Sequence, residues 1–294
     1  WPGVRWPPGW GDPWWRCDGV IRDIPISYTA DLLSSSGVPF MSSLEDRRFV
    51  GVARLYGADA LARFQRAHVG VIGVGGVGSW AVEALARSGV GRLTLIDLDH
   101  LSLSNINRQL PALDSTLGLA KVAALAARVG EIAPACQVHP VEEFVTAHNL
   151  ATLVPPGFDW VLDGIDDFRV KAALIAHCRR QRTPLITVGG AGGQRDATRV
   201  QVSDLRRTEQ DALLARTRRL LRREYGFPAN PRRRFGVPCV WSDEPVQRPA
   251  GDHCDSGLNC AGYGSAVVVT ATFGMAAAGH ILQQLAEGEV APAS

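Results

Sequence analysis

The chain has 294 residues, of which 46% are apolar and 20% charged, and its formal net charge at pH 7 is +2. This composition fits one large α/β domain or a domain with an appendage, and so small a net charge does not by itself point to any class of partner. The six cysteines contain no C-x-x-C pair and no disulfide-rich pattern, which argues against a structural zinc site and leads us to expect a cytoplasmic protein.

Residues 1–40 differ from the rest of the chain. They contain five of the eight tryptophans, show no helical or strand period, and precede the first methionine, Met41. We therefore expect Met41 to be the natural start, residues 1–40 to be a disordered or non-native extension, and residues 41–294 to form a single domain with a C-terminal extension. An aromatic binding arm is the alternative for the N-terminal segment.

From Arg47 onward, strand and helix patterns alternate. Apolar residues at Phe49, Leu55, Leu61 and Phe64 predict short amphipathic helices that lead into the first strand. Strands are expected at residues 68–74, 92–97, near 138, at 160–163 and at 185–188, with helices at 75–88, 117–132 and 169–182. Strands that alternate with helices of about 10–15 residues predict a Rossmann-like, doubly wound α/β fold, in which helices cover both faces of a mainly parallel sheet.

The C-terminal part departs from this alternation. Residues 198–202 alternate in polarity and predict an antiparallel extension of the sheet, which an arginine-rich amphipathic helix follows. Residues 256–286 contain no charged residue, and this length would permit a membrane span. Because Asn259, His280 and two glutamines interrupt the segment and no cationic loop flanks it, we expect a buried core helix and no membrane span.

Between the first strand and its helix lies the motif Gly73-x-Gly75-Gly76-x-Gly78. Glycine is expected at Gly73 for a tight turn, at Gly75 so that the backbone can approach a phosphate, and at Gly78 for close packing of helix on strand. The helix N-terminus then presents free N–H groups to an anion. Asp97 ends the next strand, 24 residues after Gly73, where its carboxylate can accept from ribose hydroxyls. By themselves these features predict a nucleotide site, most often for NAD(P) or FAD.

Two cations and two carboxylates help to decide which nucleotide the site binds. Arg108 and Lys121 follow the strand that ends at Asp97. A dehydrogenase has no need of them there, whereas an enzyme that handles a triphosphate does, since Arg can fork two phosphate oxygens and Lys offers a compact charge. Asp163 and Asp166 follow an apolar strand at its carboxyl end, where a carboxylate suits Mg²⁺. We therefore predict ATP and Mg²⁺ as cofactors, with an NAD-dependent dehydrogenase as the weaker alternative.

In order and spacing, these motifs are similar to the ATP site of the ubiquitin-activating-enzyme-like superfamily, which includes the sulfur-carrier adenylyltransferases. The similar positions are Gly73, Gly75, Gly76, Gly78, Asp97, Asp99, Asn105, Asn107, Arg108, Gln109, Gly118, Lys121, Asp163 and Asp166. The resemblance implies that Arg108 and Lys121 are the catalytic phosphate-handling pair, that Asp166 is catalytic and ligates magnesium, and that Asp97 binds the ribose. The four motif glycines, with Asp99, Asn105, Asn107 and Gln109, are the other implied ATP-binding positions. The superfamily's arginine often reaches the partner subunit's site, which implies a homodimer.

Segments around this core resemble the threonylcarbamoyladenosine dehydratase branch of the superfamily. They are residues 54–57, 75–80, 171–176, 189–194 and 269–274. Sulfur-carrier activators usually carry two C-x-x-C zinc pairs, which this chain lacks. The branch implies that ATP activates the threonyl carboxylate of N6-threonylcarbamoyladenosine in tRNA and that a carbamoyl atom of the same side chain then closes a ring. The alternative is an adenylyltransferase for the C-terminus of a small sulfur-carrier protein, and a sulfur-relay protein is a candidate partner.

Ten arginines lie within residues 206–234, against three acidic residues, around an amphipathic helix. A solvated helix face is the usual interpretation of such a run, but this density favours contact with RNA phosphates. We predict that Arg216, Arg219, Arg222 and Arg223 bind tRNA.

Two further features stay open from the sequence. Cys239 falls in a predicted mobile loop and could accept sulfur, but no adjacent His or Lys is present to lower its pKa, so a plain free thiol is the simpler interpretation. Residues 252–255 read Asp-His-Cys-Asp, which hints at a metal site but lacks a second half and favours a structural role.

Overall fold

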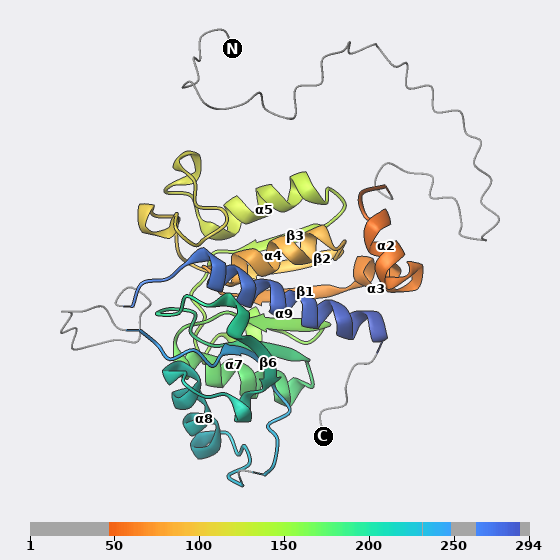
Figure 1. Ribbon diagram of the computed structural model, residues 1–294. Coiled ribbons are helices and arrows are strands. Elements are labelled where there is room, and N and C mark those ends of the chain that lie inside the picture. The colour runs from red at the N-terminus through yellow and green to blue at the C-terminus, as the bar shows by residue number, and fades with distance from the viewer. Residues whose placement is uncertain (1–46, 231, 248–262, 289–294) are drawn as a thin grey trace, which may run out of the picture. The chain divides into compact units, whose positions relative to one another are not determined.

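The computed structural model describes residues 47–230, 232–247 and 263–288 (Figure 1). The interpretations of residues 1–40 and of the Asp-His-Cys-Asp run at 252–255 lie outside the described residues. The division into an N-terminal extension and a single domain over residues 41–294 therefore stays a prediction.

The described strands form one seven-stranded sheet in the order β3-β2-β1-β4-β5-β7-β6. Their bounds are β1 His68–Ile72, β2 Arg92–Ile96, β3 Gln137–Val141, β4 Trp160–Asp163, β5 Leu185–Val188, β6 Val200–Asp204 and β7 Pro238–Ser242. Neighbouring strands are parallel, except that β6 is antiparallel to β7. The chain runs outward from β1 to β3 and then restarts at β4 on the other side of β1. The predicted doubly wound α/β class with an antiparallel extension is thus confirmed.

Helices cover both faces of this sheet (Figure 1). They are α2 Val50–Tyr56, α3 Ala58–Arg66, α4 Gly78–Arg87, α5 Lys121–Ile132, α6 Leu150–Leu153, α7 Phe168–Gln181, α8 Ala212–Glu224 and α9 Val267–Glu287, with short 3-10 turns at Leu103–Asn105, Asp114–Thr116, Ala197–Arg199 and Leu205–Arg207. One hydrophobic cluster joins α3, α4, α5 and α9 to the sheet, and a second joins α6, α7 and α8 to the opposite face. Strands that are buried on both faces explain the apolar runs in the sequence.

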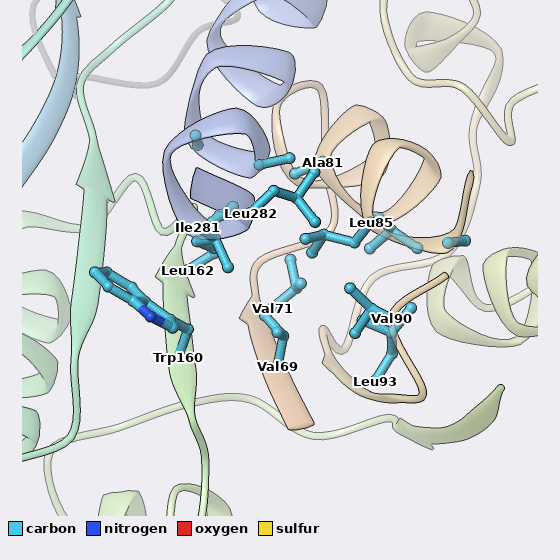
Figure 2. Close-up of a cluster of buried hydrophobic side chains, with 14 of the residues drawn as sticks. Val69, Val71, Ala81, Leu85, Val90, Leu93, Trp160, Leu162, Ile281 and Leu282 are labelled. Atoms are coloured by element: carbon cyan, nitrogen blue, oxygen red, sulfur yellow. The ribbon is translucent and has the colours of Figure 1, made fainter. Parts of the chain in front are cut away.

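Successive residues of β1 divide between these two cores. Val69 and Val71 belong to the cluster under α4 and α9, whereas Ile72 belongs to the cluster on the other face. Figure 2 shows Leu85 of α4 and Ile281 of α9 beside the side chains of β1 and β4. The side chains of Val69, Val71, Ile72, Leu85 and Ile281 are all fully buried. Burial of each such side chain stabilises the fold by about 1.5–3 kcal/mol. The packing therefore holds the carboxyl ends of β1 and β4 in place.

The uncharged segment near the C-terminus forms α9, which packs against α4. Phe273, Ala277 and Ile281 are fully buried, so the expected core helix is present. The two helices approach closely because Gly274 has no side chain: a Cβ there would lie 2.4 Å from the Val77 carbonyl oxygen. None of the helices in the described ranges is long and apolar enough to cross a membrane.

The helix expected at residues 117–132 begins later, at Lys121. Gly118 has a φ of +84°, which is outside the helical region. The N–H of Gly118 donates to the Leu101 carbonyl, and the N–H of Lys121 donates to the Asp99 carbonyl, so the segment is tied to the loop after β2. These contacts delay the helix and place Lys121 in its first turn beside that loop.

Candidate active site

A cavity of about 320 Å³ opens at the carboxyl ends of β1, β2, β4 and β5. The chain changes its winding direction between β1 and β4, and doubly wound sheets bind their ligands at this position. The glycine turn after β1 forms one wall, and residues 97–99, 143–145, 164–167 and 189–192 form others. The predicted nucleotide motif therefore lies in the wall of a cavity.

The glycines of the turn after β1 have different tasks. Gly73 has a φ of +84°, and a Cβ there would lie 2.9 Å from the Gly164 carbonyl oxygen. A Cβ on Gly78 would lie 2.0 Å from the Gly73 carbonyl oxygen, so glycine is needed for α4 to begin against the turn. The space beside Gly75 is open, with the Gln109 amide nitrogen the nearest atom at 3.8 Å from a Cβ. Gly75 thus exposes its backbone to the cavity, which suits the approach of a phosphate.

Asp97, the residue after β2, joins the glycine turn to its own loop. Its carboxylate accepts hydrogen bonds from the backbone N–H of Val74 at 2.8 Å and of Asp99 at 2.9 Å. Burial raises the pKa of this carboxyl, and the Lys121 cation opposes that rise. Each carboxylate oxygen has a second lone pair, so Asp97 can also accept from the hydroxyl groups of a ligand in the cavity.

Both predicted phosphate-handling cations line the cavity. Lys121 is almost fully buried; its Nζ donates to Asp99 Oδ2 at 2.6 Å and lies 3.8 Å from Asp97 Oδ1. Arg108 is half-buried, and its guanidinium donates to the Ser104 carbonyl oxygen at 2.7 Å. Cations that are partly removed from water attract anions more strongly than cations in bulk solvent. The two side chains are the basic residues in a lining that also holds the carboxylates of Asp97, Asp99, Glu143, Asp166 and Asp167.

The three predicted amide ligands after β2 differ in position. Asn105 lines the cavity, and its Oδ1 accepts from the Ser102 N–H at 3.0 Å, which caps the 3-10 turn. Gln109 also lines the cavity and is buried, and its Oε1 has no hydrogen-bond partner within the residues that the structure describes. Such an oxygen marks a place where a ligand donor or a water fits, because a buried acceptor without a partner is costly. Asn107 is not among the lining residues; its Nδ2 donates to the Ser265 carbonyl oxygen at 2.9 Å.

The two carboxylates that follow β4 have separate surroundings. Asp166 is exposed, lines the cavity, and makes no hydrogen bond or ion pair with the part of the chain that the structure describes. Asp163 is fully buried: its Oδ2 lies 2.9 Å from Lys171 Nζ and accepts from Thr187 Oγ1 at 2.7 Å. Asp163 is therefore a structural ion-pair partner, and Asp166 is the carboxylate available to a metal or ligand.

Comparison with known proteins identifies the family to which this chain belongs. Residues 47–291 match the family model described as the ThiF family. The chain belongs to the ThiF family. It is 46% identical over 255 residues to the tRNA threonylcarbamoyladenosine dehydratase of Haemophilus influenzae, a match that covers 85% of this chain and 98% of that protein. The resemblance to the dehydratase branch is thus confirmed.

A solved structure supports the same assignment of this ThiF-family chain. The crystal structure of the Escherichia coli tRNA N6-threonylcarbamoyladenosine dehydratase in complex with ATP has a TM-score of 0.78 and 46% identity, and the match covers 85% of this chain and 98% of that one. By contrast, a molybdopterin-synthase adenylyltransferase of Haemophilus influenzae is 35% identical over 117 residues, which cover 40% of this chain and 48% of that protein. Similarity to the dehydratases therefore extends much further along the chain.

Two segments that line the cavity were not predicted as site residues from the sequence. Residues 189–192 line it after β5, and Asp211 holds them, because its Oδ2 accepts from the Gly190 N–H at 2.8 Å and its Oδ1 from the Leu214 N–H at 2.8 Å. Burial raises the pKa of Asp211. Residues 143–145 form the other wall, after β3. The glycine run at 189–193 was an available signal, whereas Asp211 and residues 143–145 carried none.

The four arginines predicted to bind RNA do not share one surface. Arg216, Arg219 and Arg223 are exposed and line a second groove, between α7 and α8. Arg222 is half-buried, and its guanidinium lies 5.1 Å from the centre of the Phe235 ring. Arg222 is thus separated from the other three by its packing.

The placement of Cys239 in a mobile loop is wrong. Cys239 lies in β7, opposite Thr187 of β5, and is fully buried. Burial raises the pKa of its thiol well above the usual value. Because the thiolate is the reactive form of cysteine, these surroundings favour a structural thiol over a sulfur acceptor.

Proposed function

We propose that this protein is an ATP-dependent tRNA threonylcarbamoyladenosine dehydratase, which closes the threonylcarbamoyl side chain of the modified adenosine into a ring. The observation that carries the proposal is that one cavity is lined by Gly75, Asp97, Arg108, Lys121 and Asp166. The long match to dehydratases favours a tRNA substrate over the tail of a sulfur-carrier protein.

The cavity has features that are needed to bind a nucleoside triphosphate. The open space beside Gly75 admits phosphate oxygens to the backbone, and Gln109 Oε1, which has no partner among the described residues, can accept from a ligand donor. We assign Asp97, which lines the cavity, to the ribose hydroxyls, since a carboxylate after the second strand can accept from them. The volume of about 320 Å³ lies within the usual range for small-molecule sites, roughly 300–1,000 Å³.

The reaction divides a difficult dehydration into two displacements. The threonyl carboxylate attacks the α-phosphorus of ATP, the bond to the bridging oxygen of the β-phosphate breaks, and pyrophosphate leaves. A carbamoyl atom of the same side chain then attacks the acyl carbon and loses its proton, and AMP leaves with the former carboxylate oxygen. Because the second attack is intramolecular, its effective concentration is high. No protein nucleophile is required.

Arg108 and Lys121 stabilise the charge that develops during the first displacement. Arg108 can fork two phosphate oxygens, whereas the Lys121 ammonium is a compact charge close to the Asp97 and Asp99 carboxylates. Loss of one such preorganised donor costs about 3–4 kcal/mol in the transition state. Both residues are therefore assigned to catalysis.

Magnesium belongs to the same proposal. Mg²⁺ needs only one or two protein carboxylates, since substrate phosphates and waters complete its shell. Asp166 fits this role, because it lines the cavity and its carboxylate makes no bond within the described residues. No group of three potential ligands occurs among those residues, so ATP would supply most of the coordination. When bound, the ion neutralises phosphate charge.

The partners follow from the substrate and from the surface. A tRNA substrate agrees with a cytoplasmic location. We also expect a homodimer, because Leu103, Ile106 and Leu113 are 71%, 42% and 54% exposed in the segment that carries Arg108, and grouped apolar residues on a surface often mark an interface. A sulfur-relay protein stays a candidate second partner on the family resemblance alone.

The test measures the modified nucleoside itself. Purified protein is incubated with ATP, Mg²⁺ and tRNA that carries N6-threonylcarbamoyladenosine, and mass spectrometry follows the loss of one water. Arg108→Ala and Lys121→Ala should each lower the rate by about 10²–10³-fold, whereas Arg66→Ala, an exposed arginine before β1, should not.

Thermal melts show whether each variant stays folded. Activity within twofold of wild type in both Arg108→Ala and Lys121→Ala would contradict the assignment of these residues. If wild type left the nucleoside unchanged but adenylated a small protein with a Gly-Gly tail, the sulfur-carrier function would replace the one proposed.

A further inference from the structure

A groove of about 650 Å³ lies between the beginning of α7 and one side of α8. Its walls include Phe168, Arg169, Arg216, Arg219, Arg223 and Tyr225. The groove thus combines several cationic side chains with two aromatic rings, and it is separate from the cavity assigned to ATP.

The groove arginines of α8 form one stripe of the helix. Arg216, Arg219 and Arg223 follow the spacing i, i+3, i+7, which places them on the same face, and all three are exposed. Arg218 and Arg222, four residues apart, are half-buried on a different face. Two of the five arginines are therefore used in packing, and three are directed at the groove.

Most of the groove charge is not neutralised. Arg169, Arg216 and Arg219 form no ion pair with a carboxylate in the part of the chain that the structure describes. Arg223 pairs with Glu224 at 2.5 Å, but the two side chains are 67% and 47% exposed, and ion pairs this exposed contribute little. Four guanidinium groups are therefore available to an anionic ligand.

An aromatic ring lies among these cations. The guanidinium carbon of Arg169 lies 4.6 Å from the centre of the Phe168 ring, and that of Arg216 lies 5.8 Å from it. Single-stranded RNA is bound by the same combination, since bases stack on aromatic rings and guanidinium planes while arginines hold the phosphates. An acidic protein surface would use the charges but has no need of the stacking surface.

The groove adjoins the ATP cavity. Val170 lines both, and Asp167, which lines the cavity, caps the first turn of α7, where Phe168 and Arg169 are located. A polynucleotide in the groove would therefore pass directly beside the cavity that holds Asp166.

We propose that this groove binds the RNA strand next to the modified adenosine, with Arg169, Arg216, Arg219 and Arg223 on its phosphates and Phe168 under a base. This inference rests on the proposed dehydratase function and deepens it. It removes Arg222 from the set expected from the sequence and adds Arg169. The ligand is the anticodon loop of the substrate tRNA.

The experiment compares two triple variants with the same change in net charge. Arg169→Gln/Arg216→Gln/Arg219→Gln alters the groove, and Arg66→Gln/Arg92→Gln/Arg180→Gln alters exposed arginines near the amino ends of the strands. Fluorescence anisotropy with an anticodon stem–loop RNA is recorded across salt concentrations, together with ATP binding and a thermal melt.

The groove variant should bind the RNA at least tenfold more weakly, and the slope of log affinity against log salt should fall by about 2–3, since each phosphate contact contributes about 0.7–0.9. The control variant should keep the wild-type slope, and ATP affinity should be unchanged in both. Phe168→Leu should weaken binding about tenfold without changing the slope, because stacking releases no counterions.

An unchanged slope in the groove variant, or equal losses in the two triple variants, would overturn the proposal. So would competition by poly-glutamate as strong as that by unlabelled RNA, which would indicate an acidic protein as the ligand. Failure of the dehydratase function is a distinct result, because wild type would then bind the RNA in the groove but leave the modified nucleoside unchanged in the presence of ATP.

Discussion

Adding one methyl group at Gly75 or at Gly78 should test two different roles of the glycine turn, the approach of a phosphate and the packing of α4. In Gly75→Ala the new Cβ points into open space of the cavity, whereas in Gly78→Ala it would lie 2.0 Å from the Gly73 carbonyl oxygen. Gly130→Ala is the matched control, because Gly130 is an exposed residue of α5 with no atom within 4 Å of a Cβ.

The expected changes in stability have opposite signs in Gly78→Ala and Gly75→Ala. Overpacking costs about 1–3 kcal/mol or more, and at Gly78 the contacted atom belongs to the backbone and cannot rotate away. At the upper end of that range the cost exceeds the gain of about 1 kcal/mol from alanine in a helix by about 2 kcal/mol, so Tm should fall by roughly 4–8 °C. Gly75 has no positive φ, so alanine there should stabilise the protein by about 0.4–1 kcal/mol through the unfolded state. The same methyl group should weaken ATP binding at least about tenfold, which is 1.4 kcal/mol.

Differential scanning calorimetry gives Tm, and isothermal titration gives the dissociation constant for ATP. We expect Gly75→Ala to bind ATP more weakly while its Tm stays the same or rises slightly, and Gly78→Ala to melt at a lower temperature. Gly130→Ala should keep its ATP affinity and gain up to about 1 kcal/mol of stability, because alanine is the better helix residue. If Gly75→Ala bound ATP like wild type, phosphates would not approach the turn. If Gly78→Ala melted at or above the wild-type temperature, the close contact of α4 with the turn would be refuted.

Two further predictions concern buried groups. Lys171→Met leaves Asp163 buried without its cation and should lower the free energy of unfolding in urea by about 3–5 kcal/mol, whereas adding Asp163→Asn should recover most of that loss; equal losses would refute the ion pair. Burial raises the pKa of Cys178 to about 12 and that of Cys239 well above its usual value. Since thiolate forms only as pH rises toward the pKa, iodoacetamide at about pH 8 should label these thiols only after unfolding, and rapid native labelling of Cys239 would contradict its burial.

The sequence determined the parts of this protein that depend on local pattern. The strand at 68–72, the glycine turn and Asp97 lie close together along the chain, and the need for glycine at Gly73 and Gly78 is a backbone requirement that is visible in the spacing. The doubly wound sheet was predictable for the same reason, because alternating strands and helices leave few ways to bury both faces.

Other features depended on contacts between residues far apart in sequence. β7 carries no recognisable strand pattern, and only its pairing with β5 and β6 places Cys239 in the sheet. The different roles of Asp163 and Asp166 after β4 also depend on distant residues. Asp163 is buried and paired because Lys171 and Thr187 contact it in the folded chain. The run Asp-Gly-Ile-Asp-Asp does not by itself indicate which carboxylate is buried.

The arginine segment shows the same limit. Charge density in the sequence indicated an anionic partner, but it could not separate Arg222 from Arg223. Helix period alone places Arg216, Arg219 and Arg223 on one face, yet which face is free depends on where Phe235 and α7 pack against α8. Residue types and spacing therefore determined the kind of chemistry, and tertiary packing decided which side chains are free to perform it, because burial and pairing arise from segments that meet only in the folded chain.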